Sequence, residues 1–340
     1  MQFLSVRNAA RWVTATGPET VLAGLVDALE RDVRRWPEFE RTPRLAAHSD
    51  VGVIELMPTT DGDQYAFKYV NGHPGNPAHG LPTVAAFGVL ADVRTGYPTF
   101  LAEMTLLTAL RTAATSALAA RWLAPPGVDV MAMVGTGSQA EFQALAMRSQ
   151  LGVRRLRVVD VDPRAVEKFV RNLAPLGFEV EVCASVAEAV RGAGLVTTCT
   201  ADKQNATVLH LEDLTPGAHV NAIGGDCPGK TELDPRILDH ADVVVEHAPQ
   251  TRVEGEVQQR PADFPVTELW RVVRGERPGR TSPTRTTVFD SVGFAIEDFC
   301  VLVHARDAVR GTPFVEDVDL VATPEDPKDL FGMLGAPLPV

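Results

Sequence analysis

The feature that most limits the fold of this chain is an alternation of short apolar segments with longer amphipathic ones, which runs from residue 128 onward. The segment VDVMAMV (128–134) precedes AEFQALAMRSQL (140–151), and RLRVVDVD (155–162) precedes PRAVEKFVRNL (163–173). Strand-like segments recur later as EVEVC, LVTTCT, HVNAIG and DVVVE. Strands that alternate with helices in this way predict βαβ units around a parallel sheet.

The first part of the chain follows a different pattern. Helical periodicity is found at 19–35, and strand-like segments lie at 51–57, 65–70 and 84–90. Strong helix formers fill 105–123 and stop before Pro125, which is typical of a helix end. We therefore expect an α+β domain over residues 1–120 and an α/β domain over 121–311. The C-terminal segment, about 312–340, either returns to the first domain or trails from it.

A glycine-rich turn links the first predicted strand and helix of the second domain. Gly135, Gly137 and Ala140 form a G-x-G-x-x-A pattern, and Asp160 ends the next strand 25 positions after the first glycine. This spacing is typical of a Rossmann-type, doubly wound dinucleotide site, in which the acid binds a ribose. The aspartates at 160 and 162 would repel a 2′-phosphate, so NAD is favoured over NADP. The alternative is an ordinary strand-to-helix turn.

The composition narrows the classes of partner. A formal net charge of −12 argues against nucleic acid and anionic membrane surfaces as partners, because both attract basic proteins. The first residues lack the pattern of a signal peptide, and no apolar run reaches ~18 residues. The four cysteines show no C-x-x-C spacing. We expect a cytoplasmic protein without a metal site.

Four charged residues are candidates for binding or catalysis. Lys68 lies in an apolar strand-like segment, and Arg111 lies in a helix of Ala, Leu and Thr, while Arg44 precedes an apolar segment. A buried cation needs an anionic partner, and structural ion pairs compete here with an amino-acid carboxylate. Asp226 follows the strand HVNAIG, where a doubly wound sheet binds its ligands. It is either an acid/base group or a turn-forming aspartate.

Taken together, the chain resembles the ornithine cyclodeaminase/mu-crystallin family, and its bacterial ornithine cyclodeaminases in particular. The resemblance covers nearly the whole length. Long segments carry it, namely HSDVGVIELMP (48–58), YAFKYVNGHPGN (65–76), FGVLADVRTGYP (87–98), TALRTAATSALAA (108–120), NAIGGDCPGKTEL (221–233), PQTRVEGEVQQRPADFPV (249–266), TVFDSVGFAIED (287–298) and DPKDLF (326–331).

The resemblance implies roles for individual residues. Arg44, Lys68 and Arg111 would hold the substrate carboxylate, and Asp226 would be the catalytic acid/base, with Lys68 sharing its proton transfers. Glu55 would hold the distal amine of the substrate. Val292 would flank the substrate. The positions implied to contact NAD are Thr83, Arg111, Gly135, Gly137, Ser138, Gln139, Asp160, Thr200, Val220, Asn221, Ala222, Ile223, Lys230 and Ser291.

The family's reaction converts L-ornithine to L-proline and ammonia, with NAD reduced and reoxidised in each turnover. The resemblance also implies that the first domain binds substrate and forms a homodimer. Three alternatives stay open: cyclisation of lysine to pipecolate, an amino-acid dehydrogenase or cyclic imine reductase, and a binding protein without activity. The first differs from ornithine cyclisation by one methylene, which a pocket discriminates by only ~1–3 kcal/mol.

Overall fold

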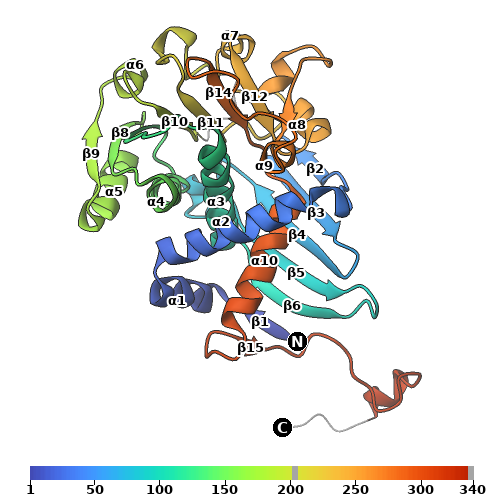
Figure 1. Cartoon of the computed structure of the whole chain (residues 1–340). Coiled ribbons are helices and arrows are strands. Elements are labelled where there is room, and N and C mark those ends of the chain that lie inside the picture. Colours follow the sequence, from blue (N-terminus) through green and yellow to red (C-terminus); the bar gives the residue numbers. More distant parts are fainter. Residues whose placement is uncertain (201–205, 336–340) are drawn as a thin grey trace.

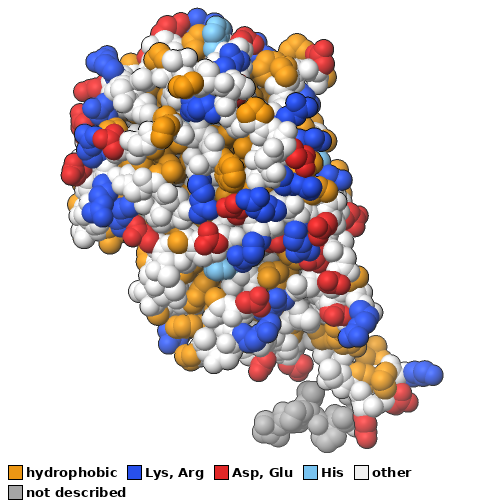
Figure 2. Space-filling view, viewed as in Figure 1, with side chains coloured by type: hydrophobic (Ala, Val, Ile, Leu, Met, Phe, Trp, Pro, Cys, Tyr) orange, Lys and Arg blue, Asp and Glu red, His pale blue; other side chains and the backbone are white. Residues whose placement is uncertain are grey.

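The computed structural model describes residues 1–200 and 206–335, which form two β-sheets with helices packed between and around them (Figure 1). This architecture confirms the predicted fold class, a doubly wound α/β part joined to an α+β part. No helix in these two ranges is long and apolar enough to span a lipid bilayer. On the face visible in Figure 2, basic and acidic side chains are interspersed.

The first sheet is mainly antiparallel and contains a strand from each end of the chain. Its strands, in spatial order, are β15 (Glu316–Asp317), β1 (Gln2–Leu4), β6 (Pro98–Glu103), β5 (Ala86–Asp92), β4 (Gln64–Gly72), β3 (Gly52–Thr60) and β2 (Leu45–Ser49). β15 pairs antiparallel with β1, so the C-terminal segment contributes to this sheet. Residues 336–340 of that segment lie outside the described part of the chain.

The second sheet is parallel at each of its strand pairs. Its order is β13 (Thr267–Glu268), β12 (Ala241–Val245), β14 (Thr286–Asp290), β11 (His219–Ala222), β10 (Leu195–Thr198), β7 (Val130–Val134), β8 (Arg155–Val159) and β9 (Glu179–Val182). β7 is buried throughout, as expected for a central parallel strand covered on both faces. The chain runs outward from β7 in both directions, so the strand order reverses between β7 and β10.

Ten α-helices lie in the described ranges: α1 (Val6–Thr16), α2 (Pro18–Arg34), α3 (Thr105–Leu123), α4 (Ala140–Leu151), α5 (Pro163–Leu173), α6 (Val186–Val190), α7 (Pro235–Asp239), α8 (Ala248–Glu254), α9 (Leu269–Val273) and α10 (Ala295–Val309). The short 3₁₀ helices of the same ranges are η1 (Trp36–Glu38), η2 (Asn76–His79), η3 (Ala174–Leu176), η4 (Leu211–Asp213), η5 (Glu256–Gln259) and η6 (Phe331–Leu334). The helix predicted at 105–123 is α3.

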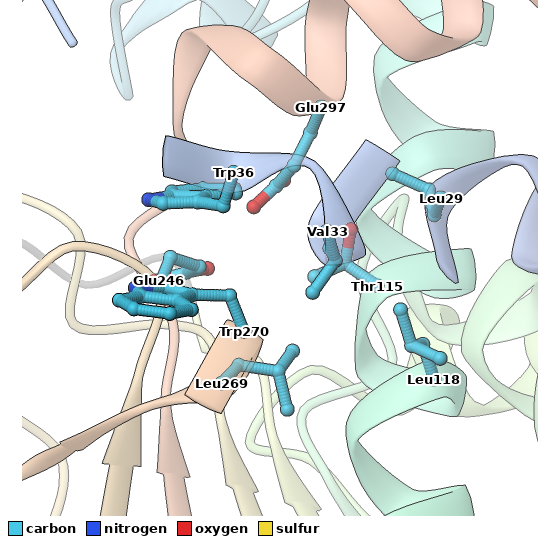
Figure 3. Close-up of a pocket in the computed structure, with 9 residues that line it drawn as sticks. All are labelled: Leu29, Val33, Trp36, Thr115, Leu118, Glu246, Leu269, Trp270 and Glu297. Atoms are coloured by element: carbon cyan, nitrogen blue, oxygen red, sulfur yellow. The ribbon is translucent and has the colours of Figure 1, made fainter. Parts of the chain in front are cut away.

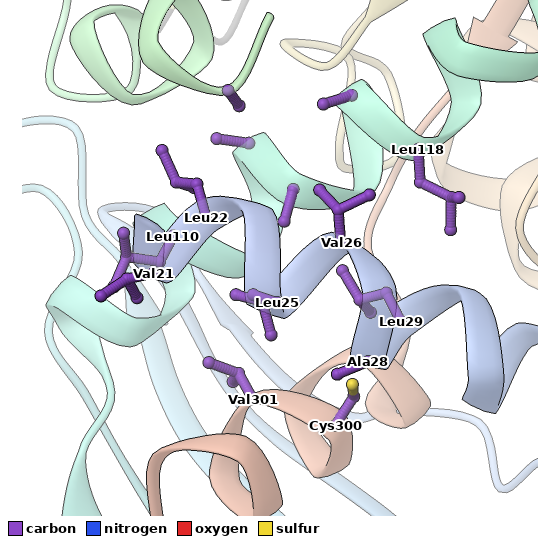
Figure 4. Packing of buried hydrophobic residues seen from close by; sticks show 14 of the residues in the cluster. Val21, Leu22, Leu25, Val26, Ala28, Leu29, Leu110, Leu118, Cys300 and Val301 are labelled. Atoms are coloured by element: carbon purple, nitrogen blue, oxygen red, sulfur yellow. The ribbon is translucent and has the colours of Figure 1, made fainter. Parts of the chain in front are cut away.

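Helix α2 connects the two halves of the molecule. Its buried side chains recur at helical spacing and include Leu22, Leu25, Val26 and Leu29. Figure 4 shows these side chains lying between α3 on one side and α10 on the other. α2 also contacts α4 and α9 of the second half, so apolar packing holds the two sheets in a defined relation.

Helix α10 follows the last long strand of the parallel sheet but packs elsewhere. It contacts β3, β4 and β5 of the first sheet as well as α2 and α3. The chain therefore crosses between the sheets at residues 291–294. This crossing brings α10 to the inner face of β4, and the division into domains at residues 120 and 311 stays a prediction.

Candidate active site

Lys68 and Arg111 meet at one carboxylate on α10. Lys68 lies on the inner face of β4 between Ala66 and Val70, and its Nζ is 2.9 Å from Oδ1 and 2.8 Å from Oδ2 of Asp298. Arg111 of α3 places its Nε 3.2 Å from the same Oδ1. Two cations predicted from separate segments therefore share one buried anion.

Burial changes the protonation of this group. Lys68 is only 1% exposed, and burial lowers its pKa to about 8, against the opposing charge of Asp298. The positive charges of Arg111 and Arg44 contribute to this lowering. All three predicted cations thus lie within electrostatic range of one another, so a substrate carboxylate placed among them would face three positive charges.

Arg44, which precedes β2, joins three elements of the site. Its Nη2 donates hydrogen bonds to the carbonyls of Val292 at 2.9 Å and Gly293 at 2.7 Å. Its Nη1 lies 3.3 Å from both carboxylate oxygens of Glu55 on β3. Its Nε lies 3.3 Å from Oε2 of Glu254 at the end of α8. Val292, predicted to flank the substrate, is therefore adjacent to the guanidinium.

Asp226 lies on the loop after β11 and extends toward solvent, with 55% of its side chain exposed. Its Oδ1 accepts a hydrogen bond from Lys230 Nζ at 3.2 Å. Burial disfavours the charged form of Lys230, but the charges of Asp226 and Glu232 outweigh it and raise the Lys230 pKa. The charge of the same aspartate also contributes to raising the pKa of Glu254 on α8.

The glycine turn has the geometry that its sequence predicts. Gly135 adopts a φ of +94°, and a Cβ atom there would lie 2.9 Å from the carbonyl oxygen of Cys199. At Gly137 an added Cβ would meet no described atom within 4 Å. Asp160 Oδ2 accepts hydrogen bonds from Thr136, at 2.6 Å from the backbone nitrogen and 3.0 Å from the hydroxyl. The turn is therefore tight at its first glycine and open at its second.

Most predicted cofactor positions line one edge of the parallel sheet. Val134, Thr198, Ala222 and Asp290 are neighbours across four adjacent strands, so the residues that follow them meet at one edge. Gly135, Thr200, Ile223 and Ser291 all lie there, and Val220, Asn221 and Ala222 form the buried end of β11.

Two other predicted cofactor positions lie in the glycine turn itself, and a third, Thr83, belongs to a loop of the first sheet. Ser138 is exposed, and Gln139 precedes α4, with a buried Oε1 that has no hydrogen-bond partner among the described residues. Thr83 lies in the loop before β5, where its carbonyl accepts a hydrogen bond from the backbone of His73. The structure thus brings the positions of the parallel sheet together, while the place of Thr83 at the cofactor and all contacts with NAD stay a prediction.

Sequence reasoning missed the buried acids that hold the loops of this edge. Glu232 accepts hydrogen bonds from the backbone of Thr200 at 2.7 Å and Gly224 at 3.0 Å. Asp290 accepts from the backbone of Glu256 at 2.8 Å and Val257 at 2.9 Å, and burial raises the pKa of Asp290 to about 7. Glu232 and Asp290 both lie in segments that carry the family resemblance. An acidic residue near glycines is also typical of a solvent-exposed loop, so the sequence did not single them out.

Arg111 also contacts a second buried acid of α10, Glu297. Arg111 Nη1 is 2.8 Å from Glu297 Oε2, and burial raises the pKa of Glu297 to about 8 although the charge of Arg111 opposes the shift. Figure 3 shows the Glu297 carboxyl pointing into a cavity that Trp36, Glu246 and Trp270 also line. In the described part of the chain, no group of histidine, cysteine or acidic residues is arranged to hold a metal ion.

The sequence of the chain is similar to those of known proteins. The model of the ornithine cyclodeaminase/mu-crystallin family matches residues 6–312. An ornithine cyclodeaminase of Brucella suis biovar 1 (strain 1330) is 55% identical over 332 residues, which cover 98% of this chain and 93% of that protein.

Two solved structures share the fold over most of their length. One is a lysine cyclodeaminase, studied for its recognition of L-lysine, L-ornithine and L-2,4-diaminobutyric acid, with a TM-score of 0.84, 34% identity and coverage of 91% of this chain and 92% of that one. The other is an archaeal alanine dehydrogenase dimer with bound NAD, with a TM-score of 0.83, 30% identity and coverage of 91% and 96%.

Proposed function

This chain belongs to the ornithine cyclodeaminase/mu-crystallin family, and we propose that it converts L-ornithine to L-proline and ammonia, as an ammonia-lyase that uses NAD catalytically. The observation that carries the proposal is the buried cation cluster: Lys68 and Arg111 share the carboxylate of Asp298, and Arg44 donates to the carbonyl of Gly293, beside which the Arg111 guanidinium lies. The 55% identity with a protein named ornithine cyclodeaminase supports this choice of reaction.

The residues present fit NAD. The open space at Gly137 leaves room for a pyrophosphate beside the first turn of α4. Asp160 uses three of the roughly four hydrogen-bond positions of a carboxylate on Thr136 and the backbone of Asp162, and can accept another from a ribose hydroxyl. The unpaired Oε1 of Gln139 is a further polar atom at the same turn, judged against the described residues. NAD also occupies the related archaeal dehydrogenase.

When bound, NAD would take the hydrogen of the substrate Cα as a hydride and later return it to the ring imine. The residues of this chain would orient the substrate for that exchange. Lys68 and Arg111, fixed by Asp298 and Glu297, would hold the α-carboxylate in one position together with Arg44. Such fixation turns ring closure into a reaction within one ordered complex.

Asp226 would transfer protons at the reacting carbon. The distal amine attacks the α-imine, which leaves a positively charged ring nitrogen beside the original α-amino group. Asp226 would take one proton from the ring nitrogen and deliver it to the α-nitrogen, which then departs as ammonia. Such general acid/base catalysis contributes ~10²–10⁴ in rate, and the partial exposure of Asp226 lets its proton exchange with solvent.

We also propose a homodimer formed through the first sheet. The side chains of Leu45, Leu56, Tyr69 and Phe87 form a row across four adjacent strands on the outer face, with Leu45, Leu56 and Phe87 exposed by 62%, 41% and 43%. An apolar row of this kind is typical of a protein interface. Light scattering should give twice the mass of the chain. A cytoplasmic location and a role in forming proline from ornithine complete the proposal.

The test of the activity is product analysis from three substrates side by side. Ornithine, lysine and 2,4-diaminobutyrate are incubated with the enzyme and a trace of NAD, and products are identified by mass spectrometry. We expect proline and one equivalent of ammonia from ornithine, with no net NADH. Faster formation of pipecolate from lysine would instead support the lysine alternative. The similarity to a lysine cyclodeaminase structure is the reason to test it. Release of a keto acid, with a reaction that stops once the trace of NAD has been reduced to NADH, would refute cyclisation.

A further inference from the structure

One buried carboxylate beside Arg44 has no part in the reaction as described so far. Glu254 is the last residue of α8 and is 9% exposed. Its Oε2 lies 3.3 Å from Arg44 Nε, but the two atoms are not aligned for a hydrogen bond. Neither has another hydrogen-bond partner within the described ranges. A buried carboxylate oxygen without a donor is costly, which points to a donor supplied by a ligand.

The charges around Glu254 favour a cationic ligand. Two carboxylates, Glu55 on β3 and Glu254 on α8, meet at the guanidinium of Arg44, and the charge of Asp226 on the loop after β11 also acts on Glu254. Arg44 pairs with Glu55 and Glu254, while Lys230 pairs with Asp226. Burial raises the pKa of Glu254 to about 7, Arg44 opposes the shift, and Glu55 and Asp226 add to it. An added positive charge would relieve the repulsion among the three acids.

We propose that Glu254 binds the distal ammonium group of the diamino-acid substrate and receives its proton before the ring closes. The inference rests on the function proposed above and names a substrate-contacting residue that the resemblance did not supply. It replaces Glu55, our prediction from the resemblance, as the residue that recognises the distal amine.

The contacts of the two glutamates distinguish them. Both oxygens of Glu55 already accept hydrogen bonds from Arg44 Nη1, so that Glu55 serves to hold the guanidinium. The Glu254 carboxylate has an enclosed oxygen without such a bond among the described residues. A substrate ammonium offers three N–H donors, which suits the unpaired acid better than the paired one.

The position of Glu254 also suits ring closure. To form a five-membered ring, the distal nitrogen must fold back to the Cα atom, which is one bond from the carboxylate. If Arg44 holds that carboxylate, a group 3.3 Å from Arg44 Nε lies where a folded-back chain brings its amine. Glu254 would therefore favour the reactive, folded conformer over an extended one.

Two ammonium protons leave before the ring closes: the α-ammonium proton is lost before hydride transfer and is regained by the ring nitrogen of proline, and the distal ammonium proton goes to Glu254. An alkylammonium has a pKa of ~10.4 and is not nucleophilic, so one proton must leave before attack. Glu254 would take it, which changes the ammonium to an amine and the carboxylate to a carboxylic acid. Asp226 then moves a further proton, from the ring nitrogen to the departing group. The proton on Glu254 is returned to the released ammonia as ammonium.

The experiment compares two ligands that differ only in the distal amine. L-Norvaline has the five-carbon chain of ornithine without the δ-amine, so its binding reports on the carboxylate end alone. For the NAD-loaded wild type, Glu254→Gln and the matched control Glu55→Gln, the KM of ornithine and the inhibition constant of norvaline are measured from pH 6 to pH 8. The quantity compared is the ratio of the ornithine constant to the norvaline constant. If a variant turns over too slowly, calorimetry gives this ratio from the dissociation constants of the two ligands.

We expect Glu254→Gln to weaken ornithine about 10- to 100-fold, as for loss of a charged hydrogen bond, and to leave norvaline within about 2-fold. In the wild type, ornithine binding should strengthen relative to norvaline as pH rises, because Glu254 becomes charged, and this trend should vanish in Glu254→Gln. Titration of Lys68 affects both ligands and cancels in the ratio. Glu55→Gln should weaken both ligands together, through Arg44.

Two results would overturn the inference. Equal weakening of ornithine and norvaline in Glu254→Gln would make Glu254 a support for Arg44 alone, and selective loss of ornithine in Glu55→Gln would restore Glu55. Failure of the proposed function appears separately, in the wild type. A wild type that prefers ornithine over norvaline but forms no proline would refute cyclisation and leave the binding role of Glu254 standing.

Discussion

Alanine substitutions at the two glycines of the cofactor turn should separate folding from NAD binding. Gly135 has a φ of +94°, and a Cβ there would lie 2.9 Å from the oxygen and 3.0 Å from the carbon of the Cys199 carbonyl, and 3.1 Å from the nitrogen of Thr200. These are backbone atoms at the ends of paired strands, so they cannot move aside cheaply. Gly137 has an ordinary φ, and an added Cβ would meet no described atom within 4 Å.

The structure sets the sizes of the two effects. A left-handed backbone costs an L-residue about 1–2 kcal/mol, and forcing a methyl against fixed atoms costs about 1–3 kcal/mol more. Gly135→Ala should therefore lose about 2–5 kcal/mol of unfolding free energy. For 340 residues, an unfolding entropy of about 2.1 cal/mol/K per residue gives about 1.4 °C per kcal/mol, so its thermal midpoint without NAD should fall by about 3–7 °C. Gly137→Ala should change the unfolding free energy by less than about 0.5 kcal/mol.

Gly137→Ala should weaken NAD binding although it hardly changes the stability of the fold. A pyrophosphate needs close approach to the backbone at the second glycine, so a methyl there should weaken NAD by about 5- to 100-fold, the equivalent of about 1–3 kcal/mol. Scanning fluorimetry without NAD measures the stability, and calorimetry measures the affinity. The reasoning fails if Gly137→Ala unfolds as early as Gly135→Ala without NAD, or if it binds NAD as tightly as the wild type.

Three further outcomes test the assignment of the charged residues. Asp226→Ala should lower turnover by about 10²–10⁴ with NAD affinity nearly unchanged by calorimetry; a matching loss of NAD affinity would count against a catalytic role. Arg111→Ala should raise the KM of ornithine and lower kcat together, because the same group orients the substrate; an unchanged KM would make Arg111 structural. Lys68 has a folded-state pKa of about 8, below its ordinary 10.5, so the unfolded chain binds more protons between these pH values and unfolding free energy should rise across them, by about 3 kcal/mol in total. Lys68→Met should lack that rise in denaturant titrations at pH 8 and pH 10.5, and equal slopes in both proteins would refute the burial argument.

Local sequence patterns were sufficient to predict helix α3 and the glycine turn. The residues 105–123 form one helix because strong helix formers run unbroken up to Pro125. Gly135 takes a positive φ because the strand must turn sharply into α4. Both features depend on neighbours a few residues away. By contrast, the N-terminal helix α1 and the edge strand β15, only two residues long, were not predicted, since their partners lie at the other end of the chain or in later segments.

The roles of the acids were beyond local reasoning for a different reason. Glu297 and Asp298 stand in a helix that begins FAIED, where acids near an N-terminus suggest a favourable helix dipole interaction. In the structure they pair with Arg111 and Lys68, which lie 186 and 230 positions earlier in the chain. The crossing of the chain at residues 291–294 brings α10 against β4 and creates these pairs.

The sequence by itself therefore determined the alternation of strands and helices, the glycine turn and the identity of the charged residues, because periodicity and turn chemistry act over short stretches of chain. Only the tertiary structure decided which acid each cation meets, and which glutamate in the pocket is left without a hydrogen-bond donor among the described residues. The energy of a charge depends on its depth and on its distance from other charges. Those quantities come into existence when distant segments pack together.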